Sequence, residues 1–170
     1  MDSLVVAVAQ YAVFLVAVGA LVVWLLVPRE EQLALAVQAV VAVLTVALLV
    51  KLGGAAHTDP RPFVVHPALR PMFAHPADNG FPSDHTAVAS AVAIVVLLHR
   101  RWSGLALLLV SIAIGAARVV AHVHHVEDIV AGLVIGTVAA LVGLLTWRAV
   151  ASRRGIGSTA GRPASSVDRG

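Results

Sequence analysis

Long runs of apolar residues alternate with short polar segments along the chain. Five runs contain few or no charged residues, at positions 4–27, 33–52, 83–98, 103–121 and 129–147. A helix of about 20 such residues can cross a bilayer. The run at 83–98 would extend over only about 24 Å as a helix, so we expect it to begin below the lipid surface. The pattern predicts an all-α integral membrane bundle of about five transmembrane helices.

The overall composition supports this prediction. The chain is 59% hydrophobic and 12% charged, whereas soluble domains carry about 25% charged residues. Five apolar runs in 170 residues leave too little polar surface for a soluble helical bundle. The absence of cysteine excludes disulfides and thiolate metal sites. The net charge of +3 is modest and the basic residues lie beside the helices, so no nucleic-acid partner is expected.

The polar segments divide the chain into one domain and a tail. Residues 53–82 form one long proline-rich loop, and loops of that length are usually functional or disordered. We predict a transmembrane domain over residues 1–151 and, from its Ser, Arg and Gly content, a disordered C-terminal tail over residues 152–170. Gly132 and Gly136 form a G-x-x-x-G pattern, which predicts close packing between helices.

Polar residues gather at one end of the predicted bundle. If the five helices alternate in direction, the long loop lies on the same membrane side as residues 122–128. The opposite side carries most flanking arginines and every tryptophan: Arg29, Arg100, Arg101, Arg148, Arg153, Arg154, Trp24, Trp102 and Trp147. By the positive-inside rule that side is cytoplasmic. We therefore predict a plasma-membrane protein with a cytoplasmic C-terminus and an extracytoplasmic site.

Three clusters on the polar side carry candidate chemistry, because ionisable groups at membrane depth are costly and usually functional. They contain Lys51, Asp59 and Arg61; then Ser83, Asp84 and His85; then Arg118, His122, His124, His125, Glu127 and Asp128. Arginine forks suit phosphate oxygens, and a lysine can add a point charge. Ser83 precedes an apolar run and is expected to be an N-cap, at a helix N-terminus that attracts anions.

Two histidines could act on a bound phosphate. His85 lies in the first turn after Ser83 and is expected to face the same site. His124 and Asp128 are four residues apart and share one face if the last helix begins there. A carboxylate on one imidazole nitrogen leaves the other nitrogen free to act as a base or nucleophile. The sequence therefore predicts an electropositive phosphate-handling site.

These motifs resemble the type 2 phosphatidic acid phosphatase superfamily, which shares its core with vanadium-dependent haloperoxidases. The family pattern is a lysine with a downstream Arg-Pro, then Pro-Ser-Gly-His, and then Ser-Arg with a His and an Asp at fixed spacings. The corresponding positions here are Lys51, Arg61-Pro62, Pro82-Ser83-Asp84-His85, Arg118, His124 and Asp128. The Phe-Pro-Ser-Asp-His-Thr form is similar to bacterial undecaprenyl-diphosphate phosphatases of the bacitracin-resistance type.

The chain departs from the family pattern at three points. Nine residues separate Lys51 from Arg61, more than the family usually has. Ala117 stands where the family has serine, and Asp84 stands where it has glycine. Asp84 suits the helix dipole but would repel a phosphate, so we expect it to orient an arginine.

The resemblance implies a membrane lipid phosphatase that hydrolyses undecaprenyl diphosphate to the monophosphate with no cofactor or metal. In that mechanism His124 attacks phosphorus, Asp128 orients His124, and His85 protonates the leaving oxygen. The substrate-binding residues would be Arg61, Arg118, Ser83, Asp84 and Lys51. A phosphohistidine would form and then be hydrolysed by water.

Other functions stay open at this point. The substrate could be another lipid phosphate, such as phosphatidic acid or phosphatidylglycerol phosphate. A metal protein could use His122, His124, His125 and Glu127, although cations at Arg61 and Arg118 would repel a metal. A non-catalytic phosphate-binding protein or transporter is the third alternative. The remaining polar residues are expected to be solvated or to serve turns and caps: His57, His66, His75, His122, His125, Asp59, Asp78 and Glu127. No sequence signal indicates an oligomeric state.

Overall fold

The computed structural model describes residues 1–153 and is all-α over that part of the chain. The helices are α1 (Asp2–Leu26), α2 (Arg29–Ala56), α3 (Pro62–Val65), α4 (Asp84–His99), α5 (Arg101–Val120) and α6 (Val126–Arg153). No strand forms within residues 1–153, where Pro60 and Asn79 make an isolated bridge. The predicted fold class is therefore confirmed.

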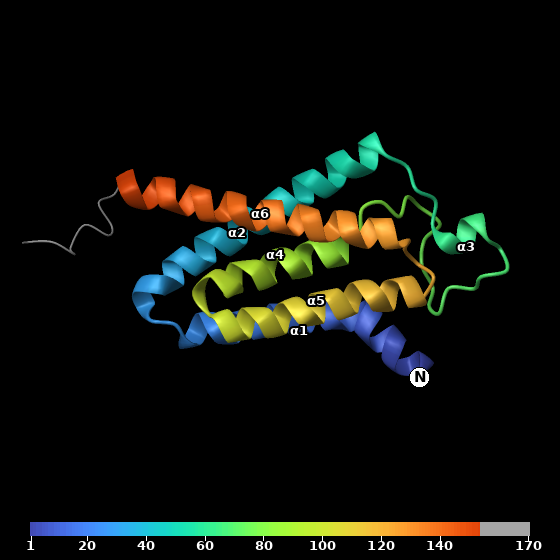
Figure 1. Cartoon of the computed structure of the whole chain (residues 1–170), viewed down its shortest axis with the longest axis horizontal. Coiled ribbons are helices and arrows are strands. Elements are labelled where there is room, and N and C mark those ends of the chain that lie inside the picture. Colours follow the sequence, from blue (N-terminus) through green and yellow to red (C-terminus); the bar gives the residue numbers. More distant parts are fainter. Residues whose placement is uncertain (154–170) are drawn as a thin grey trace, which may run out of the picture.

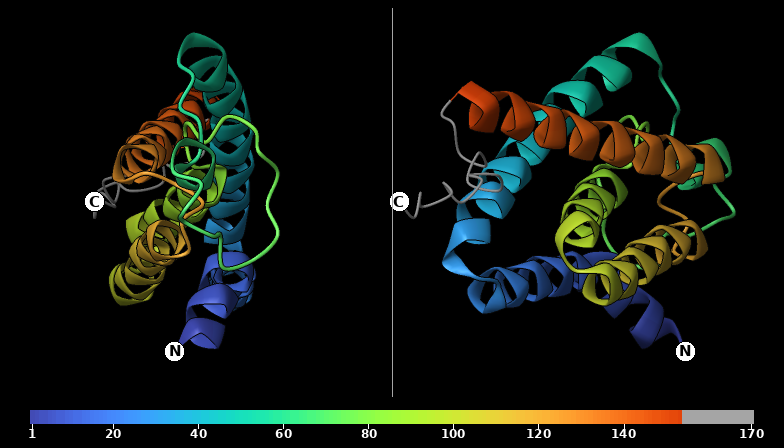
Figure 2. Two further views of the ribbon diagram at one scale, coloured as in Figure 1. Left: turned by 90° about the vertical axis from the view of Figure 1, so that its right-hand side faces the viewer. Right: turned by 60° about the vertical axis from the view of Figure 1, so that its left-hand side comes forward.

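The apolar runs account for the five long helices. Of the helices in the described part of the chain, α1, α2, α5 and α6 are long and apolar enough to cross a membrane, and α4 is a shorter apolar helix. Helix α4 packs against α1, α2, α5 and α6 and lies in the middle of the bundle (Figures 1 and 2). Since protein rather than lipid surrounds α4, its shortness is compatible with its place in the bundle.

Small residues bring α6 close to α4. A Cβ atom at Gly136 would lie 2.7 Å from the carbonyl oxygen of Ala87, and one at Gly132 would lie 2.7 Å from that of Ser83. Real side chains do not tolerate such distances, so both positions need glycine. The predicted packing role of the G-x-x-x-G pattern is confirmed. This close packing also places the start of α6 beside the start of α4, where the backbone N–H of Ser83 donates to the carbonyl oxygen of Asp128 at 3.1 Å.

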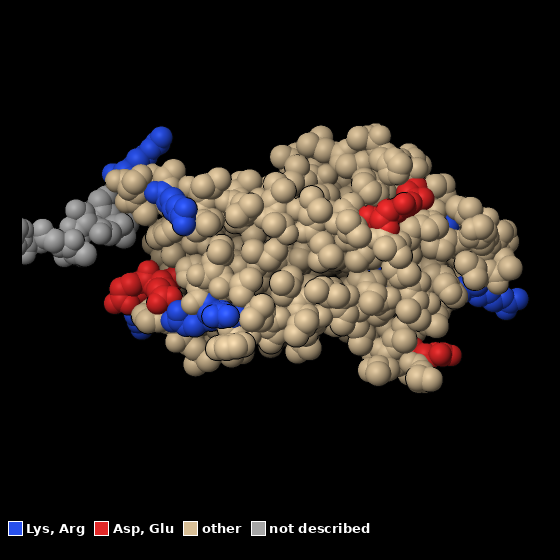
Figure 3. Space-filling view, viewed as in Figure 1, with Lys and Arg blue, Asp and Glu red and all other residues tan. Residues whose placement is uncertain are grey.

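The polar segments gather at one end of the bundle, as predicted. The end of α2, the short helix α3, the start of α4, the end of α5 and the start of α6 lie together (Figure 1). On the face drawn in Figure 3, Lys, Arg, Asp and Glu lie near the two ends and the middle is uncharged. The outer faces of the long helices carry many exposed apolar side chains. An uncharged middle between charged ends is the pattern of a membrane-spanning protein.

Several boundaries differ from the prediction. Helix α2 continues to Ala56, and α6 begins at Val126 rather than at residue 129. The long loop contains the single-turn helix α3. Helix α6 also extends to Arg153, so residues 152 and 153 of the predicted tail are helical. The rest of that tail, residues 154–170, lies outside the described residues.

Candidate active site

The long loop is folded against the ends of α2 and α6 by its own polar groups. The side-chain oxygen of Asn79 accepts from the backbone N–H groups of Asp59 (2.8 Å) and Phe81 (3.1 Å). Its amide nitrogen donates to the carbonyl oxygens of Gly54 (3.0 Å) and His57 (2.9 Å), at the end of α2. Asn79 therefore fixes the loop where it enters α4.

Arg61 begins α3 as its N-cap and points into the bundle end. Its side chain is buried, and Nη1 donates to the carbonyl oxygen of Val123 at 2.7 Å. The same nitrogen lies 3.4 Å from His124 Nε2. Its Nε donates to Asp78 Oδ1 at 2.8 Å, in an ion pair with an exposed carboxylate. Arg61 is thus held beside His124 by the loop before α6.

His124 and Asp128 form a buried pair. His124 is 2% exposed and Asp128 0% exposed, and the distance between Nδ1 and Oδ2 is 3.1 Å. Oδ2 also accepts from the backbone N–H of His125 at 2.9 Å. Because the carboxylate accepts a hydrogen bond from the N–H at Nδ1, the proton stays on Nδ1 and the lone pair is on Nε2, which faces Arg61. The expected pairing occurs, but His124 precedes α6 instead of lying on its first turn.

Arg118 comes from the last turn of α5 and is 2% exposed. Its Nη1 donates to the carbonyl oxygen of Ala9 at 3.1 Å, which ties α1 to the site. Its Nη2 donates to His75 Nε2 at 3.2 Å. Its Nε is buried and has no partner within residues 1–153. A buried guanidinium with an unused N–H is a ready donor for an anion.

His85 is oriented by its neighbour Asp84. Oδ1 of Asp84 accepts from the backbone N–H of His85 at 2.7 Å and lies 2.8 Å from its Nδ1. The hydrogen-bond partner of the Asp84 carboxylate is thus His85, whereas an arginine was expected. With Nδ1 bonded to a carboxylate, Nε2 of His85 is the ring atom that can exchange a proton with a ligand.

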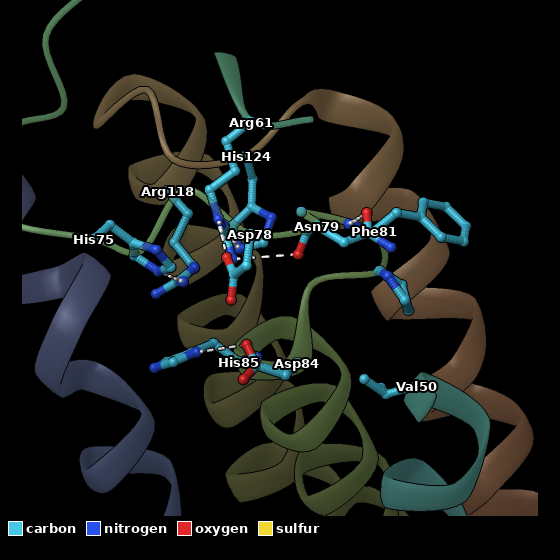
Figure 4. Close-up of a pocket in the computed structure, with 12 residues that line it drawn as sticks. Val50, Arg61, His75, Asp78, Asn79, Phe81, Asp84, His85, Arg118 and His124 are labelled. Atoms are coloured by element: carbon cyan, nitrogen blue, oxygen red, sulfur yellow. Dashed lines mark hydrogen bonds and ion pairs between the residues drawn. The ribbon is translucent and has the colours of Figure 1, made fainter. Parts of the chain in front are cut away.

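These side chains surround one pocket of about 230 Å³. It is lined by Val50, Arg61, His75, Asp78, Asn79, Gly80, Phe81, Pro82, Asp84, His85, Arg118 and His124 (Figure 4). Figure 4 shows His124 and Arg61 on one side of the opening and His85 with Asp84 on the other. Five predicted site residues therefore line the same pocket, and Asp128 supports it from behind His124.

Two predicted substrate-binding residues lie elsewhere. Lys51 is exposed, and the preceding residue, Val50, lines the pocket instead. Ser83 is the N-cap of α4 by position but is fully buried and makes no capping bond. Its Oγ lies 3.1 Å from Thr86 Oγ1. Neither side chain reaches the pocket wall in this structure.

Two lining residues, His75 and Asp78, were expected to be solvated or to serve a turn. Instead, His75 contacts Arg118 and its ring centroid lies 6.5 Å from that of His124. Burial lowers the pKa of His75, and the charges of Arg61 and Arg118 lower it further. Burial acts to raise the pKa of Asp78, but its hydrogen bond and ion pair with Arg61 outweigh this and lower it. His75 is therefore neutral and Asp78 is charged near neutral pH.

The electrostatics at His124 favour a neutral imidazole. Burial lowers its pKa, the hydrogen bond to Asp128 opposes that shift, and Arg118 and Arg61 lower the pKa further. A neutral imidazole retains the Nε2 lone pair, which a nucleophile needs.

The other histidines near Arg118 have different partners. His122 Nδ1 lies 3.1 Å from the carbonyl oxygen of Arg70, and His125 Nε2 lies 3.2 Å from that of Pro60. Among residues 1–153 no group of three or more His, Cys, Asp or Glu side chains is arranged to hold a metal ion. The geometry thus favours an anion as the ligand of this pocket.

Residues 34–153 match the sequence pattern of the PAP2 superfamily. The chain belongs to the PAP2 superfamily. The resemblance predicted from the three motifs is therefore confirmed. The match includes every residue that lines the pocket and leaves α1 outside. Helix α1 joins this PAP2 core through the bond from Arg118 to Ala9.

Similar proteins agree with this assignment. The chain is 31% identical over 150 residues to the undecaprenyl-diphosphatase BcrC of Bacillus subtilis strain 168, covering 87% of this chain and 74% of the relative. It is also 31% identical to the bacitracin transport permease protein BcrC of Bacillus licheniformis, with coverage of 78% of this chain and 65% of the relative. The putative undecaprenyl-diphosphatase YbjG of Escherichia coli K12 is 36% identical over 53% of this chain and 46% of its own length.

A solved structure shares the fold. LpxE of Aquifex aeolicus superimposes with a TM-score of 0.71 over 85% of each chain, at 23% sequence identity. The PAP2 chain therefore has the helix arrangement of a structurally characterised protein.

Proposed function

We propose that this PAP2 protein is a membrane lipid phosphatase that hydrolyses undecaprenyl diphosphate to the monophosphate and phosphate. The observation that carries the proposal is the buried His124–Asp128 pair beside two guanidinium groups, Arg61 and Arg118. A neutral nucleophile supported by a carboxylate, next to fixed positive charges, suits attack on a phosphoryl group.

The first step is transfer of the terminal phosphoryl group to His124. The lone pair on Nε2 forms a bond to phosphorus, while the bond from phosphorus to the bridging oxygen breaks. The electron pair of that bond stays on the leaving lipid phosphate, which His85 can protonate. Arg61 and Arg118 stabilise charge on the phosphoryl oxygens, and Asp128 balances the charge that develops on His124.

In the second step water replaces the imidazole. His85, now without its proton, accepts a proton from the attacking water. The bond from phosphorus to Nε2 breaks and its electron pair returns to the ring, which restores neutral His124. Inorganic phosphate then leaves the pocket. The positive charge that divalent ions often supply in phosphoryl transfer is here supplied by arginines, so we propose that no metal is needed.

The substrate proposal rests on the motif form and on the relatives. The relative from Bacillus subtilis is an undecaprenyl-diphosphatase, and the Escherichia coli relative is a putative one. Another lipid phosphate, such as phosphatidic acid or phosphatidylglycerol phosphate, is the runner-up. The name of the Bacillus licheniformis relative indicates transport instead, which a non-catalytic protein could support.

Phosphate release from purified full-length protein tests the proposal. We expect turnover of undecaprenyl diphosphate with a higher kcat/KM than phosphatidic acid or phosphatidylglycerol phosphate. The activity should persist in EDTA and be inhibited by vanadate, which mimics five-coordinate phosphorus. Preference for phosphatidic acid would favour the runner-up substrate. Substrate binding without any release would favour the non-catalytic alternative.

We further propose that the site faces the outside of the plasma membrane and that the C-terminus is cytoplasmic. The lack of native cysteine allows single-cysteine labelling in intact cells. Thr58→Cys, in the exposed loop at the site end, should react with a membrane-impermeant maleimide, whereas Ser152→Cys, near the opposite end, should react only after lysis. The reverse labelling pattern would invert the topology.

A further inference from the structure

A second hollow adjoins the active-site pocket. It has a volume of about 330 Å³, and its lining includes Gln10, Tyr11, Phe73, His75, His85 and Arg118. The last three of these also line the pocket that contains His124. Figure 4 shows the His85 ring pointing toward the ribbon of α1, below Arg118 and His75. The second hollow therefore extends the site toward α1.

The two hollows lie on different sides of the proposed reaction. His124 lines only the first hollow, whereas His85 lines both. In an in-line displacement the nucleophile and the leaving group lie on opposite sides of phosphorus. The general acid has to reach the leaving oxygen. With His124 as nucleophile and His85 as acid, the leaving group lies toward the second hollow.

The lining of the second hollow suits an anion. It contains Arg118 and two imidazoles, and none of its lining residues is acidic. A third hollow that also touches His85 is different in character, because Val13 and Val88 line it together with Asp84. A lipid chain fits apolar walls of that kind, whereas a phosphate needs N–H donors.

The hydrogen bonds of His75 allow it to bind such an anion. Its Nδ1 lies 3.3 Å from the carbonyl oxygen of Pro76, so Nδ1 carries the proton and Nε2 accepts from Arg118. A phosphate that enters the hollow can replace His75 as the acceptor of the hydrogen bond from Arg118 Nη2. Since Arg118 Nε is buried without a partner within residues 1–153, this side chain can offer two donors. His75 is neutral without a ligand, but the negative charge of a bound phosphate favours its protonated form, which can donate from Nε2 to that phosphate.

We propose that the second hollow is a subsite for the phosphate that remains on the leaving lipid, and that His75 is its specificity-determining residue. The site would thereby distinguish lipid diphosphates from lipid monophosphates. This inference rests on the proposed phosphatase function and adds to it the subsite and the residue that select a diphosphate.

A comparison of two substrates tests the role of His75. Relative to wild type, His75→Ala should lower kcat/KM for undecaprenyl diphosphate by about 10- to 100-fold, the effect of losing one charge-assisted hydrogen bond. It should leave kcat/KM for phosphatidic acid within about threefold, because that substrate places no phosphate in the second hollow. His66→Ala changes an exposed histidine of the same loop and is the matched control, expected to behave like wild type.

Equal losses on both substrates would overturn the proposal, since they would indicate a general role of His75 in holding Arg118. An unchanged kcat/KM for the diphosphate would overturn it as well. If His75→Ala lowers the melting temperature, His75→Gln provides the second variant and should show the same selective loss. A monophosphate preference in the wild-type enzyme would also contradict the subsite while leaving phosphatase activity intact.

Binding without turnover separates this inference from the proposed function. Calorimetry on the full-length protein should give tighter binding of methylenediphosphonate, which cannot be hydrolysed, than of methylphosphonate. His75→Ala should remove most of that preference. If wild type binds both compounds equally, the subsite is wrong even if phosphate is released. If no lipid phosphate is hydrolysed but the preference and its loss are observed, the subsite stands and the catalytic proposal fails.

Discussion

Replacing Asp128 by asparagine removes a buried charge with almost no change in size. The carboxylate has two partners through Oδ2: His124 Nδ1 at 3.1 Å and the backbone N–H of His125 at 2.9 Å. An amide oxygen at that position would keep both bonds as weaker, neutral ones. An amide nitrogen there would instead oppose both donors and favour the other tautomer of His124, which has no lone pair on Nε2.

The two possible orientations of the amide set the lower and upper limits of the expected loss in kcat. Replacing two charge-assisted bonds by neutral ones costs about 1 kcal/mol each, or roughly 30-fold in kcat. Loss of the productive tautomer costs about 10⁴-fold in a Ser-His-Asp triad, where the carboxylate has the same task. We therefore expect kcat of Asp128→Asn to fall between about 30-fold and about 10⁴-fold.

Phosphate release at saturating substrate measures this loss. Glu127→Gln is the matched control, because it removes the same charge from an exposed neighbour in the same helical turn and should keep near-wild-type kcat. Melting temperatures in detergent would check that both variants fold. A kcat for Asp128→Asn within about threefold of wild type would refute the assigned role of the His124–Asp128 pair.

Four further predictions follow from the same geometry. His124→Ala should lower kcat by at least about 10³-fold and His125→Ala by far less; the opposite order would assign the nucleophile to His125. His85→Ala should slow formation of the phosphoenzyme by about 10²- to 10⁴-fold with phosphatidic acid but by under about tenfold with a diphosphate, whose leaving phosphate needs little protonation; equal losses in this first step would argue against an acid role. Burial lowers the pKa of His124 below the ordinary histidine value of about 6.5. As the pH falls, kcat/KM should therefore begin to decline only below about pH 6.5, and a decline centred above that value would contradict a buried nucleophile. Gly136→Ala should destabilise the protein by about 1–3 kcal/mol, since its Cβ would meet the backbone of Ala87; an unchanged melting temperature would contradict the close packing.

The sequence predicted the helices well because apolar length is a local property. Their boundaries were less accurate where polar residues belong to a helix. Glu127 and Asp128 resembled a polar connection, but acidic residues are favoured in the first turn of a helix, and both lie within α6. The opposite error affected His124: α6 begins at Val126, after this residue, so His124 and Asp128 do not share a helical face and meet as a loop residue and a helix residue.

Spacing within a motif predicted part of the site. Arg61, His85, Arg118 and His124 occur in short patterns and do line one pocket. Lys51 does not, because successive residues on a helix point about 100° apart and Val50 occupies the direction of the pocket. A lysine several residues away from its usual register could not be placed from the sequence alone.

His75 and Asp78 could not have been found by pattern. They lie in an irregular loop, and their partners Arg118 and Arg61 are 43 and 17 residues distant along the chain. Such contacts depend on how the loop folds back over the bundle end, which has no periodic signal. The loop residues are therefore the part of the site that required the structure.

Trapping the phosphoenzyme tests whether His124 is the nucleophile. Protein mixed with undecaprenyl diphosphate labelled at the terminal phosphate is quenched in base within milliseconds and digested for mass spectrometry. We expect label on His124 that is stable in base and labile in acid, absent from His124→Ala, and more persistent in His85→Ala, where water lacks its base. Phosphate release at the wild-type rate with no labelled histidine, or with the label on His125, would contradict this role of His124.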